Sequence, residues 1–173
     1  IYVPQQDESQ AAQLLLTDQL DMGFIMQVLT LESVLERNDQ IMTFTEREPP
    51  YGYLDWCPID LSLNCSAAPF DNPQIRQAIS LAVDRDKLVG LAESGAGVAA
   101  LHPFTPYEWF APFIDPLDEM IAAKGYGTSA KPEEVARIMQ ANGYAKDDED
   151  MWVDAASERV EISMYVPQWL KPY

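Results

Sequence analysis

The chain has 173 residues, and its 28 acidic residues outnumber the 11 lysines and arginines, which gives a formal net charge of −17. A chain this acidic argues against binding to nucleic acid or to an anionic membrane surface, because both need clustered Lys and Arg. Hydrophobic residues make up 47% and charged residues 23% of the chain, the balance of a globular domain with one sizeable core. The sequence contains no run of about 18 apolar residues, so it predicts no membrane-spanning helix.

Short strands and helices are predicted to alternate along the first 50 residues. Asp7 is the expected N-cap of a helix, with Gln10 as its capping-box partner. Thr30 is the expected N-cap of a second helix, whose apolar face contains Val34 and Leu35. Strands are predicted by β-propensity before, between and after these helices, at residues 1–3, 20–25 and 41–45.

The clearest helix signal is at residues 71–73, where Asp or Asn caps the helix and Pro lies in its first turn. An apolar stripe then continues from Ile75 to Val89. This stripe predicts one helix that ends near the glycines of residues 95–97.

The second half of the chain combines a predicted loop, a helix and a hairpin. Residues 99–118 contain four prolines and several aromatic residues, which predicts a long loop of the kind that often carries function. A helix is expected to begin at Pro132 and to end before Gly143, its C′ glycine. Residues 151–153 and 160–166 are predicted to pair as a hairpin. Because strands and helices alternate, the predicted fold class is α/β.

The sequence predicts no catalytic residue, metal site or cofactor. His102 is the chain's one histidine, so clusters of several His ligands are excluded, and no G-x-S-x-G turn is present to expose a nucleophilic serine. An ordinary hydrogen-bonded loop histidine is therefore the simpler interpretation of His102. The acidic run at residues 147–150 lacks the alternating spacing and central glycine of a calcium loop, which favours a solvated turn.

Aromatic side chains in loops and at strand ends are the candidates for a binding site, since they show no helical periodicity. Two interpretations stay open at this point. The rings pack in a core or between lobes, or they stack on a ligand in a cleft. The residues concerned are Tyr51, Tyr53, Trp56, Tyr107, Trp109 and Phe110.

The two cysteines, Cys57 and Cys65, lie close together in a segment rich in Pro, Asp, Ser and Asn. In an exported protein we expect them to form a disulfide. The short loop that it closes would contribute roughly 2.5 kcal/mol on the chain-entropy model. In a reducing cytosol they would remain thiols. No histidine lies nearby and no second cysteine pair exists, so a structural zinc site is not expected.

Residues 69–85 resemble the signature segment of solute-binding protein family 5, the peptide-, nickel- and oligosaccharide-binding components of ABC importers. The shared letters include Pro-Phe-Asp at the start, Arg-Gln-Ala-Ile-Ser in the helix and Asp-Arg at the end. The chain departs from the family pattern at Ala68, Asn72 and Gln74, with milder replacements at Ile75 and Val83. At position 72 the family pattern has Asp.

Further blocks follow in the family's order. Residues 61–64 are similar to its L-x-L-N step, and residues 15–21 and 97–103 are weaker matches. Residues 131–144 resemble the family's D-P-E-K-A-K-x-L-L-x-E-A-G-Y segment and depart from it at Lys131, Ala141 and Asn142. Because family members are much longer than this chain, the resemblance implies an excised section of such a protein.

The resemblance implies a fold and a function for residues 1–173. The expected architecture is a single α/β lobe of a two-lobed clamp like the type II periplasmic binding proteins, with a mixed sheet and flanking helices. In such clamps a ligand lies between lobes that close by a hinge motion. The implied function is that of an ABC importer's substrate-binding component and not of an enzyme, with oligopeptide as the first choice of ligand. The alternatives are an oligosaccharide-binding member of the family or a non-binding structural lobe, and a nickel complex also stays open as a ligand.

The resemblance also implies partners and a location. The partners are an oligopeptide or oligosaccharide and, for the full-length protein, an ABC permease; the protein is expected to be monomeric and to bind no nucleic acid. The expected location is extracellular or periplasmic, with the full-length protein tethered to the membrane. Trp56, Tyr107 and Trp109 suit stacking on sugar faces as well as lining a peptide pocket. The expected ligand-binding residues are Tyr53, Trp56, His102, Tyr107 and Trp109.

Overall fold

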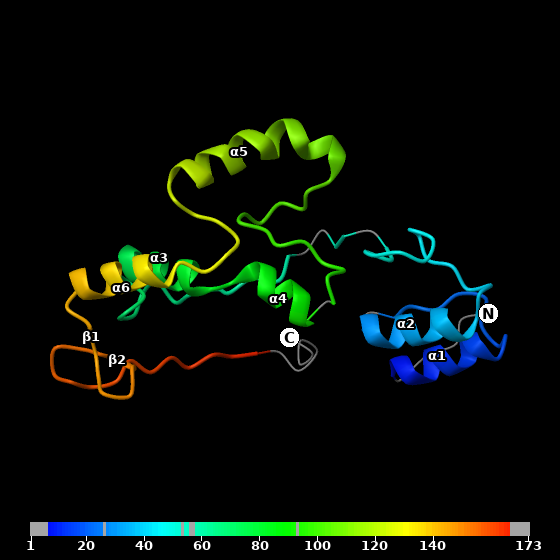
Figure 1. The fold of residues 1–173 in the computed structure, drawn as a ribbon, viewed down its shortest axis with the longest axis horizontal. Coiled ribbons are helices and arrows are strands. Elements are labelled where there is room, and N and C mark those ends of the chain that lie inside the picture. The colour runs from blue at the N-terminus through cyan, green and yellow to red at the C-terminus, as the bar shows by residue number, and fades with distance from the viewer. Residues whose placement is uncertain (1–6, 26, 53, 56–57, 93, 167–173) are drawn as a thin grey trace. The chain divides into compact units, whose positions relative to one another are not determined.

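A computed structural model describes residues 7–25, 27–52, 54–55, 58–92 and 94–166 (Figure 1). The chain divides into two compact units, Ile1–Asp55 with Leu88–Val98, and Trp56–Lys87 with Ala99–Tyr173. No helix in the described ranges is long and apolar enough to cross a bilayer. The elements, in chain order, are α1 (Glu8–Leu16), α2 (Val28–Arg37), α3 (Pro73–Ala82), α4 (Arg85–Ala92), the 3-10 helix η1 (Glu108–Phe110), α5 (Ala111–Ala123), α6 (Pro132–Ala141), β1 (Ala145–Lys146) and β2 (Trp152–Val153).

The described residues form helices and one two-stranded antiparallel sheet, β1 with β2, in place of the mixed sheet predicted. The strands predicted at residues 20–25 and 41–45 are wrong, and the one predicted at 1–3 lies outside the described residues. At residues 41–45 the backbone instead closes a tight turn, in which the N–H of Thr43 donates to Glu46 O at 2.7 Å. The β-propensity of a segment takes effect only where another strand pairs with it, and within the described residues these segments have no such partner.

Helices α1 and α2 lie side by side in the first unit (Figure 1). The predicted capping of α1 is confirmed, because the Asp7 side chain accepts a hydrogen bond from the N–H of Gln10 at 2.8 Å. Between the two helices, Ala11, Val34 and Leu35 are buried. The small side chain of Ala11 lets the two backbones approach, so the apolar contact is made mostly by α2.

The predicted start of α2 at Thr30 is wrong by one turn, because the helix begins at Val28 after Gln27. The reason is a tertiary contact. The N–H of Gln27 donates to the Glu8 side chain of α1 at 2.8 Å, which fixes the chain ahead of the local capping signal.

The far end of α2 is held by one guanidinium group. Arg47 donates to the carbonyls of Leu35, Asn38 and Ile41, the last at 2.8 Å. A cation at the carboxyl end of a helix also meets the negative end of its dipole. Arg47 therefore satisfies one carbonyl of the last turn, that of Leu35, together with two carbonyls that follow the helix.

The core of the second unit is the contact between α3 and α6, which lie side by side (Figure 1). Its buried residues come from one face of each helix, at the helical spacing that the sequence predicts. Tyr126, Val135, Tyr144 and Trp152 pack around this cluster. The buried residues are Ile75, Ala78, Leu81, Ile138 and Met139.

One predicted helix is two helices in the structure. The backbone becomes extended at Val83, which ends α3, and the Asp84 side chain then accepts from the N–H of Lys87 at 2.9 Å as α4 begins. The break is stabilised from outside the helix, because the N–H of Arg85 donates to Thr128 O at 2.8 Å. The continuous apolar stripe could not reveal this partner, which is distant in sequence.

The predicted loop over residues 99–118 is wrong in its second half, which forms η1 and the start of α5. Pro112 lies in the first turn of α5, where a missing N–H costs nothing. Pro116 lies inside the helix. It has no N–H to donate to Pro112 O, so the first turn of α5 has one hydrogen bond fewer than its length implies.

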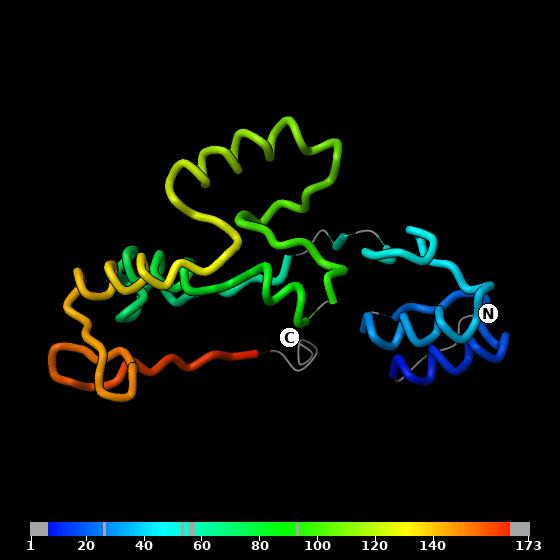
Figure 2. The backbone as a smooth tube through the Cα atoms, viewed as in Figure 1, coloured from blue at the N-terminus to red at the C-terminus, as the bar shows by residue number. Residues whose placement is uncertain are grey.

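The chain after α6 follows the prediction at first and then departs from it. Helix α6 begins at Pro132, and Gly143 has the positive φ of 84° expected of a C′ glycine. The hairpin, however, pairs β2 with β1. In the predicted partner segment, residues 160–166, only the N–H of Val160 donates to β2. Residues 161–166 continue without regular secondary structure (Figure 2).

Candidate functional site

Four aromatic residues of the second unit gather where η1 runs into α5. Tyr107 precedes η1, Trp109 and Phe110 belong to it, and Phe113 follows in the first turn of α5. This change from extended chain to helix within a few residues turns successive rings toward one another. We call these four residues, Tyr107, Trp109, Phe110 and Phe113, the aromatic platform.

The rings of the platform are in contact, and two of them are largely exposed. The centroids of Tyr107 and Trp109 are 5.8 Å apart with planes 11° from parallel, and those of Trp109 and Phe110 are 3.9 Å apart. Phe113 meets Phe110 edge-on at 6.5 Å. Despite these contacts Trp109 is 68% and Phe113 75% exposed. The platform thus offers a preordered aromatic surface, since ring pairs fix each other's orientation.

The ring of His102 is mostly buried and is hydrogen-bonded at both nitrogens. Its side chain is only 6% exposed, and its Nε2 lies 3.2 Å from Asp118 Oδ1 in α5. Its Nδ1 accepts from the N–H of Phe104 at 3.2 Å, so the proton of the neutral ring is on Nε2 and is donated to Asp118. Both nitrogens are used, and His102 fastens the loop to α5.

The other predicted binding residues are not brought to the platform by any described contact. Tyr53 and Trp56 lie outside the described residues. Tyr51 belongs to the first unit, where its hydroxyl donates to Glu32 Oε1 at 3.0 Å. Burial, and then the hydrogen bond to Glu32, raise the pKa of the Tyr51 hydroxyl above its ordinary value.

The predicted disulfide between Cys57 and Cys65 is not supported. Cys65 is a free, exposed thiol whose Sγ lies 3.5 Å from Leu63 O. Cys57 lies outside the described residues.

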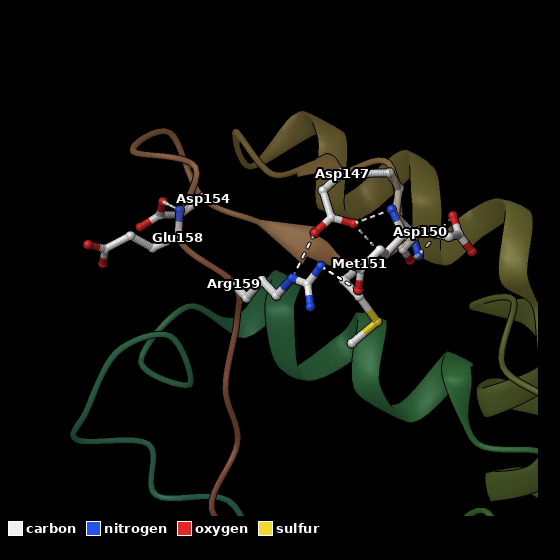
Figure 3. A network of polar contacts seen from close by, with 8 residues as sticks. Asp147, Asp150, Met151, Asp154, Glu158 and Arg159 are labelled. Atoms are coloured by element: carbon white, nitrogen blue, oxygen red, sulfur yellow. Dashed lines mark hydrogen bonds and ion pairs between the residues drawn. The ribbon is translucent and has the colours of Figure 1, made fainter.

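The acidic run at residues 147–150 forms the turn between β1 and β2 (Figure 3). Asp147 Oδ1 accepts from the N–H groups of Glu149 and Met151, the latter at 2.8 Å, and Oδ2 accepts from Arg159 Nε at 2.8 Å. Arg159 also pairs with Glu149 at 2.8 Å. No group of three or more His, Cys, Asp or Glu in the described ranges is arranged to hold a metal ion. The carboxylates of this turn thus hold the hairpin itself.

Acid should weaken this turn through Asp147. The hydrogen bond from the Met151 N–H, with further ones from Arg159 and the Glu149 N–H, holds the pKa of the Asp147 carboxyl below its ordinary value. A lowered pKa stabilises the fold above the unfolded-state pKa, and this contribution disappears as the pH falls through the folded-state value. We therefore expect Asp147→Asn to lower the urea midpoint at pH 7 and to lose less stability than the unmodified protein on acidification.

The matched control for that experiment is the exposed neighbour, Asp148→Asn, which should leave both the midpoint and its pH dependence close to those of the unmodified protein. Equal pH profiles for the unmodified protein and Asp147→Asn would contradict the role assigned to Asp147.

The family-like segment at residues 69–85 is scaffold. Asn72 caps α3 by accepting from the N–H of Gln74 at 2.9 Å, and its Nδ2 donates to Asn142 Oδ1 at 2.8 Å. Arg76 donates to Phe70 O at 2.6 Å, within the turn that leads into α3. Asn72 thus joins α3 to the end of α6, and Arg76 holds the turn that precedes α3.

Two shallow grooves lie elsewhere in the described residues. One, with a volume of about 350 Å³, lies along α1 and α2 and is lined by Gln13, Leu29 and Arg37 among others. The other, of about 320 Å³, lies beside α6 and is lined by Val135 and Trp152 among others. Neither contains a residue of the aromatic platform.

The sequence did not single out Phe113 or Asp118 as parts of the site. Phe113 is the fourth ring of the platform and Asp118 is the partner of His102. A signal was present, because Phe113 and Leu117 are four residues apart and Pro112 suits a first helical turn. This helix signal was missed because the prolines of residues 99–118 favoured the prediction of a loop.

Comparison with known proteins identifies the class. The sequence model of "Bacterial extracellular solute-binding proteins, family 5 Middle" matches residues 1–169. The chain belongs to this family, and the resemblance read from residues 69–85 is confirmed.

Two relatives match parts of the chain. Heme-binding protein A of Haemophilus influenzae is 29% identical over 94 residues, which are 54% of this chain and 15% of that protein. Glutathione-binding protein GsiB of Pectobacterium atrosepticum is 34% identical over 70 residues, 40% of this chain and 12% of that protein. The aligned segments are thus a small share of both relatives. No solved structure matches the chain.

Proposed function

We propose that the protein carrying this chain is the substrate-binding component of an ABC importer, which captures oligopeptides between two lobes and delivers them to a membrane permease. The observation that carries this proposal is the family match over residues 1–169. A family of extracellular solute-binding proteins implies transport and not catalysis. It also implies an extracellular or periplasmic location, whereas no observation supports a membrane tether.

The choice of oligopeptide draws on one relative and on the platform. GsiB is named for glutathione, which is itself a tripeptide. The open rings of Trp109 and Phe113 suit the apolar parts of a peptide. Sugar faces stack on such rings as well, so an oligosaccharide is the second candidate. Within this proposal Tyr107 and Trp109 contact the ligand, Tyr53 and Trp56 are further contacts, and His102 holds the loop in place.

The proposal is tested by thermal-shift and tryptophan-fluorescence titrations of the full-length protein with mixed short peptides and, separately, with oligosaccharides. A ligand present at 100 times its Kd stabilises the folded state by about 2.7 kcal/mol, which raises Tm by several degrees. Trp109→Leu should reduce this rise. Trp152→Phe, a change at a ring that packs against the α3–α6 core, is the control and should preserve it.

The outcomes separate the candidates. A Tm rise with peptides alone supports the oligopeptide importer. A rise with sugars alone replaces it by the oligosaccharide candidate, with Trp109 as the stacking residue. No rise with either class contradicts both ligand assignments and leaves only membership in the family.

A further inference from the structure

The segment that carries the aromatic platform contains carboxylates and no Lys or Arg. Residues 99–123 include Glu108, Asp115, Asp118 and Glu119, and the nearest basic residue in the chain is Lys124 at the end of α5. Glu108, Asp115 and Glu119 are exposed. Asp118 is the partner of His102. A ligand that approaches the rings therefore meets a negative field, within a chain whose net charge is −17.

One feature of α5 opposes this field. Its amino end lies next to Phe110, and a helix of this kind carries about half an elementary positive charge at that end, felt within its first turn. Glu108 alone, with a full negative charge one residue before Trp109, outweighs it. Asp115 and Glu119 carry the same sign, so the net charge of the segment that bears the platform is negative.

The protein itself contains the contact that such a surface favours. In the hairpin, Lys146 Nζ lies 4.5 Å from the centroid of the Trp152 ring. A cation over an aromatic ring is attracted by the negative face of the ring. At the platform Trp109 and Phe113 are exposed and acidic residues adjoin them in the sequence, but residues 99–123 contain no Lys or Arg.

From this geometry we infer that the ligand places a cationic group, a guanidinium or an ammonium side chain, on the open rings of the aromatic platform, so that the importer selects basic oligopeptides. The inference rests on the proposed function and specifies its substrate class. The group lies against Trp109 and Phe113 with Glu108 as its counter-ion. Acidic peptides, which bring a like charge to the same carboxylates, bind least.

The test uses three tripeptides that share their termini and differ only in the central side chain: Ala-Arg-Ala, Ala-Leu-Ala and Ala-Glu-Ala. Their Kd values for the full-length protein are measured by isothermal titration calorimetry. We expect the Arg peptide to bind roughly three- to tenfold more tightly than the Leu peptide, the range of a cation–π contact. The Glu peptide should be the weakest of the three.

Two variants examine the residues that carry the inference. Glu108→Gln, which keeps the shape of an exposed side chain, should reduce the Arg-to-Glu affinity ratio even if a ring variant fails to fold. Trp109→Leu should bring the Arg-to-Leu ratio close to one. The control Glu133→Gln, an exposed carboxylate in α6, should leave both ratios unchanged. Raising the salt concentration from about 0.05 M to about 0.5 M should also reduce the Arg-to-Glu ratio, because salt screens exposed charges.

The results separate two failures. Equal Kd values for the three peptides, or tightest binding of the Glu peptide, would overturn the cationic assignment and leave the oligopeptide importer in place. Ratios that stay the same in Glu108→Gln and Trp109→Leu would also overturn it. Binding of none of the three peptides would overturn the oligopeptide proposal, and the inference with it.

Discussion

Replacing Ile138 by alanine is expected to lower the free energy of unfolding by about 3 kcal/mol, the cost of deleting most of a buried aliphatic side chain. Ile138 is 4% exposed and lies in the cluster that joins α6 to α3. The substitution leaves a cavity in this cluster. Because the cluster is the main apolar core of its unit, few neighbouring side chains can move in to fill that cavity. Urea unfolding followed by circular dichroism measures the loss.

The control for this substitution is Ile138→Val, which removes a single methylene group and should cost about 1 kcal/mol. A loss below about 1 kcal/mol for Ile138→Ala would mean that the α3–α6 contact is not the core of its unit. An exposed apolar residue, Leu91→Ala, gives the baseline, since Leu91 is 75% exposed.

Asn72→Asp is expected to destabilise the protein by about 1 to 1.5 kcal/mol, although Asp stands at this position in the family pattern. A carboxylate still accepts from the Gln74 N–H and keeps the cap. It cannot donate to Asn142 Oδ1, as Asn72 does. The amide of Asn142 cannot turn over to compensate without losing its own bond to Ile138 O at 2.8 Å.

A double-mutant cycle checks this interaction. In an Asn142→Ala background the partner is absent, and Asn72→Asp should then cost close to nothing or stabilise slightly, because a carboxylate favours the amino end of a helix. The coupling free energy, measured by urea unfolding, should be about 1 kcal/mol. Additive effects of the two substitutions would show that the two side chains do not interact.

This pair shows what the sequence could and could not reveal. Asn72 and Asn142 were both visible as departures from the family pattern. The hydrogen bond between them could not be predicted, because they are 70 residues apart in the sequence. Local signals succeeded where the partner was local: the cap at Asp7 and the glycine at Gly143 are both confirmed. The end of α3 was missed because Thr128 and Lys131, far along the chain, supply the bonds that define it.

The candidate site, too, was predictable only in part from the sequence. The loop position of Tyr107 and Trp109 was evident from the prolines around them, and both are described at the platform. The same prolines hid α5, and with it Phe113. The His102 ring was predicted as a ligand contact, and its bond to Asp118 could not be foreseen because α5 was not predicted.

Three arginines of this acidic chain have a structural role that lysine cannot take over. Arg47, Arg76 and Arg85 each direct their guanidinium group to backbone carbonyls, with two or more acceptors per side chain. Lysine would keep the net charge, but its ammonium is a single point on a flexible stem and does not match a fork of fixed donors. Arginine-to-lysine replacement, usually regarded as harmless, is therefore among the least tolerated changes at these three positions. Sequence drift in relatives of this chain should preserve the guanidinium there even where the surrounding acidity changes.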